Sequence, residues 1–114
     1  MLLSREMTFC AFHSHKGMLY EPHHDHEFKV TLSMQGELND EGFFVDFRAV
    51  KRIFRRVVAR ELEGQDLDLV FAYPTSENLA IWVWEKMSAF FPLHSVEVRE
   101  KPHSSAVYFG PEKP

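Results

Sequence analysis

Apolar and polar residues alternate in two stretches near the start of the chain, residues 2–13 and 24–38. Successive side chains of a β-strand point to opposite faces, so this alternation predicts two strands that each have one face on a core. His24 and His26 share the parity of the apolar residues that follow them, and His13 ends the apolar parity of the first stretch. If the two strands pair antiparallel, three imidazoles converge at one end of a sheet.

Three histidines on one face could bind a metal, or they could simply be packed or exposed. Their spacing does not decide between these two interpretations. A buried imidazole needs a partner because an unpaired polar group is costly in an apolar environment. Three protein ligands with an open fourth position are the arrangement of a catalytic zinc site. A His-x-His pair on a strand is, however, often a matter of packing or surface exposure. Metal binding by His13, His24 and His26 is therefore one of two hypotheses at this point.

Helical spacing replaces the alternation after the turn-forming residues 37–42. Asp46 is a typical N-cap, and apolar residues then recur every three or four positions as far as Leu62. A second helix is predicted to begin after its own N-cap, Thr75, and to end before Pro92. The middle of the chain thus contains two amphipathic helices.

Two further strands, residues 94–100 and 104–109, are predicted to close the chain. Between the helices, the alternation of Leu67, Leu69 and Phe71 is compatible with a short extended segment. The order strand, strand, helix, helix, strand, strand predicts an α+β fold, in which two helices cover one face of a four-stranded antiparallel sheet. The outer strands would be exposed edges, which favours a homo-oligomer.

Size and composition limit the classes of protein to consider. The 114 residues suit one domain, residues 1–114, with a small core. A formal net charge of −4 argues against a dedicated nucleic-acid partner, and no apolar run is long enough to cross a membrane. The single cysteine, Cys10, excludes an internal disulfide and is expected to be a small buried residue. With no signal-peptide core at the N-terminus, we expect a cytoplasmic protein.

Two acidic residues near predicted strand ends are candidates for chemistry. Glu100 shares the parity of Val96 and Val98, so it is expected to face inward, where a carboxylate needs a partner. It could accept two parallel N–H bonds from a guanidine-like ligand, or it could pair with one of the chain's own arginines. Glu21 lies three residues before His24 and could act as a general base or orient an imidazole.

The polar side of the first predicted helix is basic. It could bind phosphate or nucleic acid, but a solvated face or a subunit contact is favoured because the chain as a whole is acidic. The residues concerned are Arg48, Lys51, Arg52, Arg55, Arg56 and Arg60.

Five short motifs occur in order along nearly the whole chain. They are Phe9-x-Ala11-x-His13, His24-Asp25-His26, Gly42-Phe43-Phe44-Val45-Asp46-Phe47, Pro74-Thr75-Ser76-Glu77-Asn78-Leu79-Ala80, and Val96-x-Val98-x-Glu100 with Tyr108 after it. Together they resemble the motifs of the 6-pyruvoyl tetrahydropterin synthases and of the bacterial 6-carboxytetrahydropterin synthases of the queuosine pathway.

The resemblance implies the tunnelling fold (T-fold), in which three sheets close into a barrel and two trimers stack into a homohexamer. It implies zinc bound by His13, His24 and His26. It also implies a pterin whose amino-pyrimidine edge binds Glu100, with further pterin contacts from Thr75, Ser76 and Glu77. The implied activity is that of a zinc-dependent lyase. Such an enzyme converts 7,8-dihydroneopterin triphosphate, or a close analogue, to a 6-substituted pterin such as 6-carboxy- or 6-pyruvoyl-tetrahydropterin.

The acid–base residues depart from the family's pattern. Tyr20 stands where the family usually has its catalytic cysteine. However, Glu21-Pro22-His23-His24-Asp25-His26 resembles the Glu-x-x-His-Gly-His variant of a subgroup that uses glutamate and forms a hydroxymethylpterin. The Asp-His pair that the family has after the first helix is replaced by Glu63-Gly64, so Glu63 or Asp66 is predicted to carry part of the proton relay.

These departures leave three hypotheses about function. The first is a lyase with Glu21, Glu63 and Asp66 as its catalytic residues. The second is a metal-containing protein that binds a pterin or purine without the family's lyase activity. The third is a structural oligomer whose histidines bind no metal.

Overall fold

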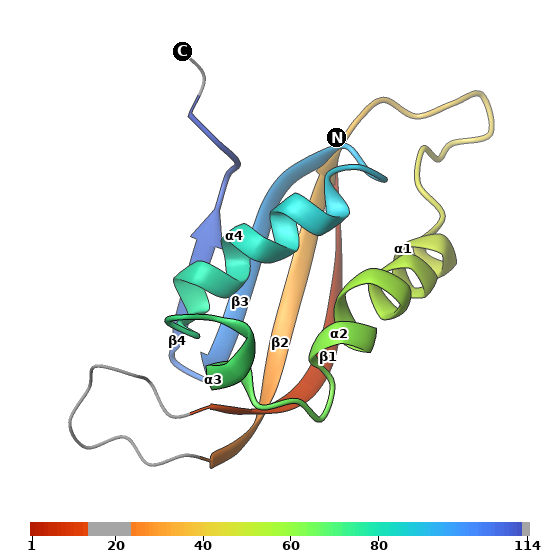
Figure 1. Ribbon diagram of the computed structural model, residues 1–114. Coiled ribbons are helices and arrows are strands. Elements are labelled where there is room, and N and C mark those ends of the chain that lie inside the picture. The colour runs from red at the N-terminus through yellow and green to blue at the C-terminus, as the bar shows by residue number, and fades with distance from the viewer. Residues whose placement is uncertain (14–23, 113–114) are drawn as a thin grey trace.

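Four antiparallel strands form one sheet in the order β1-β2-β3-β4, and the helices lie against one face of it (Figure 1). The computed structural model describes residues 1–13 and 24–112, without the side chains of residues 24 and 25. The strands are β1 (Leu2–His13), β2 (His24–Gln35), β3 (Leu93–Lys101) and β4 (Ser104–Tyr108). The α+β architecture predicted from the sequence is confirmed.

The register of β1 and β2 agrees with the alternation of their side chains. The backbone of His13 pairs with that of His24, and Ala11 pairs with His26. Every second residue of β1 from Met7 onward is buried, His13 included. Directly opposite residues of an antiparallel pair lie on the same face of the sheet, so His26 shares the helix-covered face with Ala11 and His13.

One long helical stretch crosses the sheet near β1. It consists of α1 (Phe47–Phe54), a π-helical turn η1 (Arg55–Ala59) and α2 (Arg60–Leu62). Asp46 caps it as predicted, because its Oδ1 accepts the backbone N–H of Arg48 at 2.9 Å. The side chains that this stretch buries against the sheet are Val50, Phe54, Val58 and Leu62.

The second predicted helix is α4 (Ser76–Met87), which lies over β3 and β4. Thr75 caps it, because its Oγ1 accepts the backbone N–H of Asn78 at 3.1 Å. The side chains that α4 buries are Leu79, Ala80, Val83 and Met87. The helical stretch near β1, helix α4 and the inner face of the sheet thus share one core. None of the helices in the described ranges is long and apolar enough to cross a membrane.

The segment between these helices differs from the sequence expectation. The residues expected to extend form a short helix, α3 (Leu67–Val70). Asp66 starts this helix, because its Oδ1 accepts the backbone N–H of Asp68 at 3.0 Å. Leu67 is buried, but the side chain of Leu69 is 85% exposed, so the alternation of leucines did not mark a core-facing strand.

The outer edge of β1 is partly covered by the residues that follow α2. The backbone N–H of Cys10 donates to Oε2 of Glu63 at 2.8 Å, and the carbonyl of Cys10 accepts the N–H of Gly64 at 2.7 Å. The N–H of Phe12 donates to the carbonyl of Gln65 at 2.9 Å. Cys10 is exposed, so its predicted burial was wrong. It belongs to the parity of β1 that faces away from the core.

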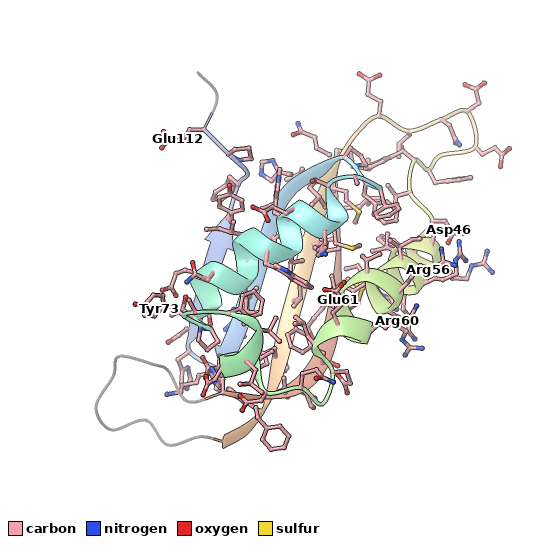
Figure 2. The ribbon with its side chains drawn as sticks, in the orientation of Figure 1. Asp46, Arg56, Arg60, Glu61, Tyr73 and Glu112 are labelled. Carbon is pink, nitrogen blue, oxygen red and sulfur yellow. The ribbon has the colours of Figure 1, made fainter. Side chains whose placement is uncertain are left out.

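The basic side chains of α1, η1 and α2 are exposed, as expected for a solvated face. Figure 2 shows Arg56 and Arg60 on the outer side of this helical stretch. Arg48 is 3.5 Å from the carboxylate of Asp46, a surface ion pair of small energetic value.

Two glycines with positive φ offer a matched test of packing at the end of β4. Gly110 has φ 93° and Gly42 has φ 91°. A Cβ at Gly110 would lie 2.5 Å from the ring of Trp84, whereas a Cβ at Gly42 would have no neighbour within 4 Å. We expect Gly42→Ala to cost about 1–2 kcal/mol through backbone strain alone. Gly110→Ala should cost about 1–3 kcal/mol more through overpacking.

Urea denaturation of both variants, at one protein concentration, measures the difference. Equal losses of stability would show that the contact between Gly110 and Trp84 does not constrain the end of the sheet.

Candidate functional site

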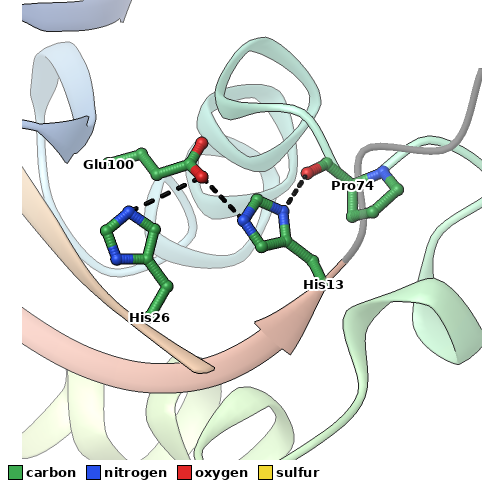
Figure 3. A network of polar contacts seen from close by, with 4 residues as sticks. All are labelled: His13, His26, Pro74 and Glu100. Carbon is green, nitrogen blue, oxygen red and sulfur yellow. Dashed lines mark hydrogen bonds and ion pairs between the residues drawn. The ribbon is translucent and has the colours of Figure 1, made fainter. Parts of the chain in front are cut away.

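Three titratable side chains converge at the end of the sheet where β1 finishes (Figure 3). The Nε2 atom of His13 lies 2.7 Å from Oε1 of Glu100, and the Nε2 atom of His26 lies 3.5 Å from the same oxygen. The two imidazole rings are 6.1 Å apart between centroids. Three different strands therefore supply the groups that meet at one carboxylate oxygen.

His13 is held rigidly. Its side chain has no exposed area, and its ring packs edge-on against Phe28 with the centroids 5.2 Å apart. Its Nδ1 lies 3.2 Å from the backbone carbonyl of Pro74. A carbonyl can only accept, so Nδ1 carries a proton and donates it to Pro74. The carboxylate of Glu100 can also only accept, so Nε2 is the donor of the 2.7 Å contact, and the two contacts together fit the doubly protonated ring. Loss of the Nε2 proton leaves a lone pair directed towards Glu100.

The electrostatic surroundings of His13 favour its protonated form. Burial by itself lowers the pKa of His13, but the hydrogen bond to Glu100 and the charge of Glu100 outweigh it. The carbonyl of Pro74 and the charge of Asp68 act in the same direction. The net result is a pKa above the ordinary value of 6.5. The point between the imidazoles and Glu100 is thus one where positive charge is stabilised.

Glu100 itself lies between the histidines and an open cavity. Its side chain is only 8% exposed, as the inward parity of β3 predicted, and its described contacts are to histidines rather than to an arginine. A cavity of about 240 Å³ on one side of it is lined by Ser76, Glu77, Glu100, Lys101, Ser104 and Ser105. Another of about 240 Å³ is lined by His26, Glu27, Lys29, Arg99, Glu100, Lys101 and Pro102. A polar ligand in this second cavity would lie beside both Glu100 and His26.

Most of the predicted binding residues come together here. Ser76 and Glu77 line the same cavity as Glu100, and Thr75 caps α4 immediately before them. Each of these assignments as a binding residue stays a prediction. Their placement puts the start of α4 beside the end of β3.

The structure describes only part of the predicted metal site. The backbone of His24 pairs with that of His13, but its side chain lies outside the described part of the chain. Among the described side chains, no group of three or more His, Cys, Asp and Glu residues is arranged to hold a metal ion. Glu21, the predicted base, also lies outside the described residues.

The described donors nevertheless fit a metal in their chemistry. Two imidazole nitrogens face one carboxylate oxygen, and the Nδ1–H of His13 donates to the carbonyl of Pro74, so Nε2 is the ring nitrogen whose proton a metal can replace. A metal-ligating histidine typically donates its other ring N–H to a carbonyl or carboxylate in this way. The remaining ligand of the predicted set, His24, stands opposite His13 in the sheet.

Glu63 and Asp66, the predicted relay residues, make contacts to the backbone. The carboxylate of Glu63 accepts the N–H of Cys10, and that of Asp66 accepts the N–H of Asp68. Asp66 also forms an isolated parallel bridge with Phe12, the residue before His13. Their roles in proton transfer stay predictions, while their structural roles at the edge of β1 and the start of α3 are clear.

The sequence analysis predicted no role at the site for several residues that contribute to it. Pro74 acts through its backbone carbonyl, and Asp68 through its charge near His13. The small polar residues of β4 that line the cavity, Ser104 and Ser105, lie across from Glu100 only because β3 and β4 form a hairpin. A strand prediction alone could have pointed to the β4 serines but not to Pro74.

Comparison with known proteins gives consistent results. The family model described as 6-pyruvoyl tetrahydropterin synthase matches residues 2–111. A dihydroneopterin monophosphate aldolase of Pyrococcus furiosus is 32% identical over 75% of this chain and 73% of its own length. A 6-carboxy-5,6,7,8-tetrahydropterin synthase of Synechocystis is 31% identical over 96% of this chain and 94% of its own.

The solved structure of Caenorhabditis elegans 6-pyruvoyl tetrahydropterin synthase has the same fold. It superposes with a TM-score of 0.83 and 21% identity, and the match covers 97% of this chain and 96% of that one.

Proposed function

Because this chain belongs to the 6-pyruvoyl tetrahydropterin synthase family, we propose that it is a zinc-dependent lyase acting on a reduced pterin with a phosphorylated side chain. The substrate class is 7,8-dihydroneopterin triphosphate or the corresponding monophosphate. The observation that carries the proposal is the convergence of His13 and His26 on one oxygen of Glu100, beside a polar cavity.

We assign the metal to His13, His24 and His26. Neutral imidazole nitrogens are the commonest protein ligands of zinc, and three of them leave one position for the substrate. Zinc bound there supplies Lewis acidity towards the hydroxyl groups of the pterin side chain. The protein's part is to keep His13 in the required tautomer through Pro74 and to exclude water by burying its ring.

We assign the pterin ring to the cavity beside Glu100. A carboxylate can accept two parallel N–H bonds from an amino-pyrimidine edge, and it is the residue type that matches such an edge in both geometry and charge. Ser76, Glu77 and the β4 serines surround this position with further hydrogen-bonding groups. The 6-side chain of a ring held there would extend towards His26.

The branch of chemistry favoured by this chain is cleavage of the pterin side chain. Glu21 replaces cysteine as the proposed base, and the Pyrococcus furiosus relative of this chain is an aldolase. A base that removes the proton of the side-chain 2′-hydroxyl allows the bond between C1′ and C2′ to break. The electron pair of that bond passes to C1′ and the conjugated dihydropterin ring, and C1′ then takes up a proton. The phosphate leaves on the two-carbon aldehyde formed from C2′ and C3′, and a 6-hydroxymethyl-7,8-dihydropterin remains. Elimination to a pyruvoyl product would instead release the phosphate as a separate ion.

The proposed role of Glu21 is tested by Glu21→Gln. This change removes the basic group but keeps the length of the side chain, so turnover should fall about 10²- to 10⁴-fold, the usual contribution of a general base. The zinc content should not change. Incubation with dihydroneopterin mono- and triphosphate, followed by chromatography of the pterin and phosphate products, measures the rate and identifies the branch.

Glu41→Gln, in the exposed turn before α1, is the matched control and should retain full turnover. Unchanged turnover in Glu21→Gln would remove Glu21 as the base. Release of inorganic triphosphate without a two-carbon aldehyde would contradict the cleavage branch while leaving the lyase proposal intact.

We further propose that the chain works as a cytoplasmic homohexamer. The outer strands β1 and β4 support assembly, because a sheet edge is suited to pair with another subunit and residues 63–65 cover the edge of β1 only near Cys10 and Phe12.

A further inference from the structure

The backbone carbonyl of Pro74, which accepts the Nδ1 proton of His13, belongs to a tight turn between α3 and α4. Pro74 is buried, but the preceding residue, Tyr73, is 60% exposed. Pro74 has no N–H of its own to hold the turn in place. The position of its carbonyl therefore depends on the hydrogen bonds of its neighbours.

Asn78 makes two of those bonds. Its side-chain Nδ2 donates to the carbonyl of Tyr73 at 2.9 Å, and its backbone N–H donates to Oγ1 of Thr75 at 3.1 Å. The N–H of Thr75 donates to the same carbonyl of Tyr73 at 2.9 Å. Asn78 thus joins both residues that flank Pro74 to the first turn of α4.

Helix α4 is a rigid support for this arrangement. Leu79, next to Asn78, is fully buried in the core, and its N–H donates to the carbonyl of Thr75 at 2.9 Å. Because α4 is fixed in the core, the hydrogen bonds of Asn78 hold the turn in place. The turn in turn holds the Pro74 carbonyl beside His13. The turn and the imidazole come from positions 61 residues apart in the chain.

We propose that Asn78 is a positioning residue for His13, and that its side-chain amide keeps the Pro74 carbonyl on Nδ1 so that Nε2 stays directed at the metal position. This inference deepens the proposed function, since it concerns the same site. The positioning role of Asn78, in the Pro74–Ala80 motif, is separate from the pterin-binding roles proposed for Thr75, Ser76 and Glu77.

The residue type fits the task. The carbonyl of Tyr73 needs a donor, and among side chains of this size only asparagine supplies an N–H group without a charge. Aspartate has nearly the same shape but can only accept when ionised. In the first turn of a helix it is also favourable to the helix dipole, so Asn78→Asp removes the donor without weakening α4.

The test compares Asn78→Asp and Asn78→Ala with Asn39→Ala. Asn39 is a suitable control because it also holds a turn through its side chain, accepting the N–H groups of Glu41 and Phe43, but in the loop before α1. Zinc affinity is measured by competition with a chromophoric chelator. The tautomer of His13 is read from ¹H–¹⁵N correlation spectra of the metal-free protein above the pH at which the ring loses its extra proton. These spectra are recorded in a Glu100→Gln background, because the Glu100 carboxylate would otherwise accept the proton of Nε2, whereas a glutamine amide can donate to Nε2.

Both Asn78 variants should bind zinc about tenfold more weakly, the lower end of the 10- to 100-fold range for groups that orient a metal ligand. In the Glu100→Gln background their His13 should show a mixture of tautomers, in contrast to the Nδ1–H form expected when Asn78 is present, with or without Asn39→Ala. A purely structural role for Asn78 would lower the melting temperature of Asn78→Ala without changing the tautomer.

Unchanged tautomer and zinc affinity in folded Asn78→Asp would overturn the proposal. If the parent protein binds no zinc, the proposed function fails, but the tautomer of the metal-free protein still decides the role of Asn78.

Discussion

Replacing His13 with alanine is expected to weaken zinc binding at least about 100-fold and to abolish turnover. Loss of a group that merely orients a metal ligand costs 10- to 100-fold, so loss of the ligand itself should cost more. The variant should also unfold more easily, by about 3 kcal/mol, because it leaves a cavity and removes the 2.7 Å partner of the nearly buried Glu100. Zinc titration and thermal denaturation measure the two effects.

His26→Ala separates metal binding from stability. The side chain of His26 is 23% exposed and lies farther from Glu100 than His13 does, so its loss should disturb the core less. Zinc binding should nevertheless fall by a similar factor. His103→Ala, in the exposed turn between β3 and β4, is the matched control and should leave both properties unchanged. Undiminished zinc affinity in both site variants would contradict the assigned ligands.

Glu100→Gln is expected to weaken binding of a dihydropterin about 10- to 200-fold. A glutamine presents one acceptor and one donor where the amino-pyrimidine edge needs two acceptors. Loss of a hydrogen bond to a charged group costs about 1.5–3 kcal/mol, which corresponds to this range. Calorimetry with 7,8-dihydroneopterin measures the change without requiring turnover. Glu97→Gln is the matched control, since Glu97 lies on the same strand but pairs with Arg99 at 3.8 Å.

The same variant makes a prediction about His13 in the metal-free protein. Burial alone lowers the pKa of His13, and Glu100 is the main group that raises it above 6.5. Without the carboxylate, burial should dominate, so the ring should lose its proton at lower pH than in the parent. An NMR titration of the ring carbons measures this shift. A pKa that stays raised would show that Glu100 is not the carboxylate that controls the charge of His13.

The sheet and the core-facing positions of its histidines were predictable from the alternation of apolar and polar residues. This alternation shows on which face of a strand each side chain lies. One parity of β1 and β2 places His13 and His26 on the core face, and antiparallel pairing aligns their ends. The same rule placed Glu100 inward, despite the irregular register between Val98 and Lys101. Side-chain parity is a local property of the chain, so it can be read without knowing the fold.

The contacts that complete the site were not predictable in this way. The Pro74 carbonyl reaches His13 only because a short helix, α3, brings the chain back across the end of β1. That helix was missed because Asp66 starts a single turn, too short for helical periodicity to appear in the sequence. A backbone carbonyl, moreover, has no residue type by which a sequence could identify it.

The most direct test is the zinc content of the purified protein, measured on the same preparation as its turnover of 7,8-dihydroneopterin triphosphate and monophosphate. We expect about one zinc per chain and a 6-substituted pterin product that disappears on chelation and returns when zinc is restored. Zinc without any pterin product would favour a binding protein over a lyase. A chain that takes up no zinc and leaves both pterins unchanged would contradict the proposed site and the proposed function together.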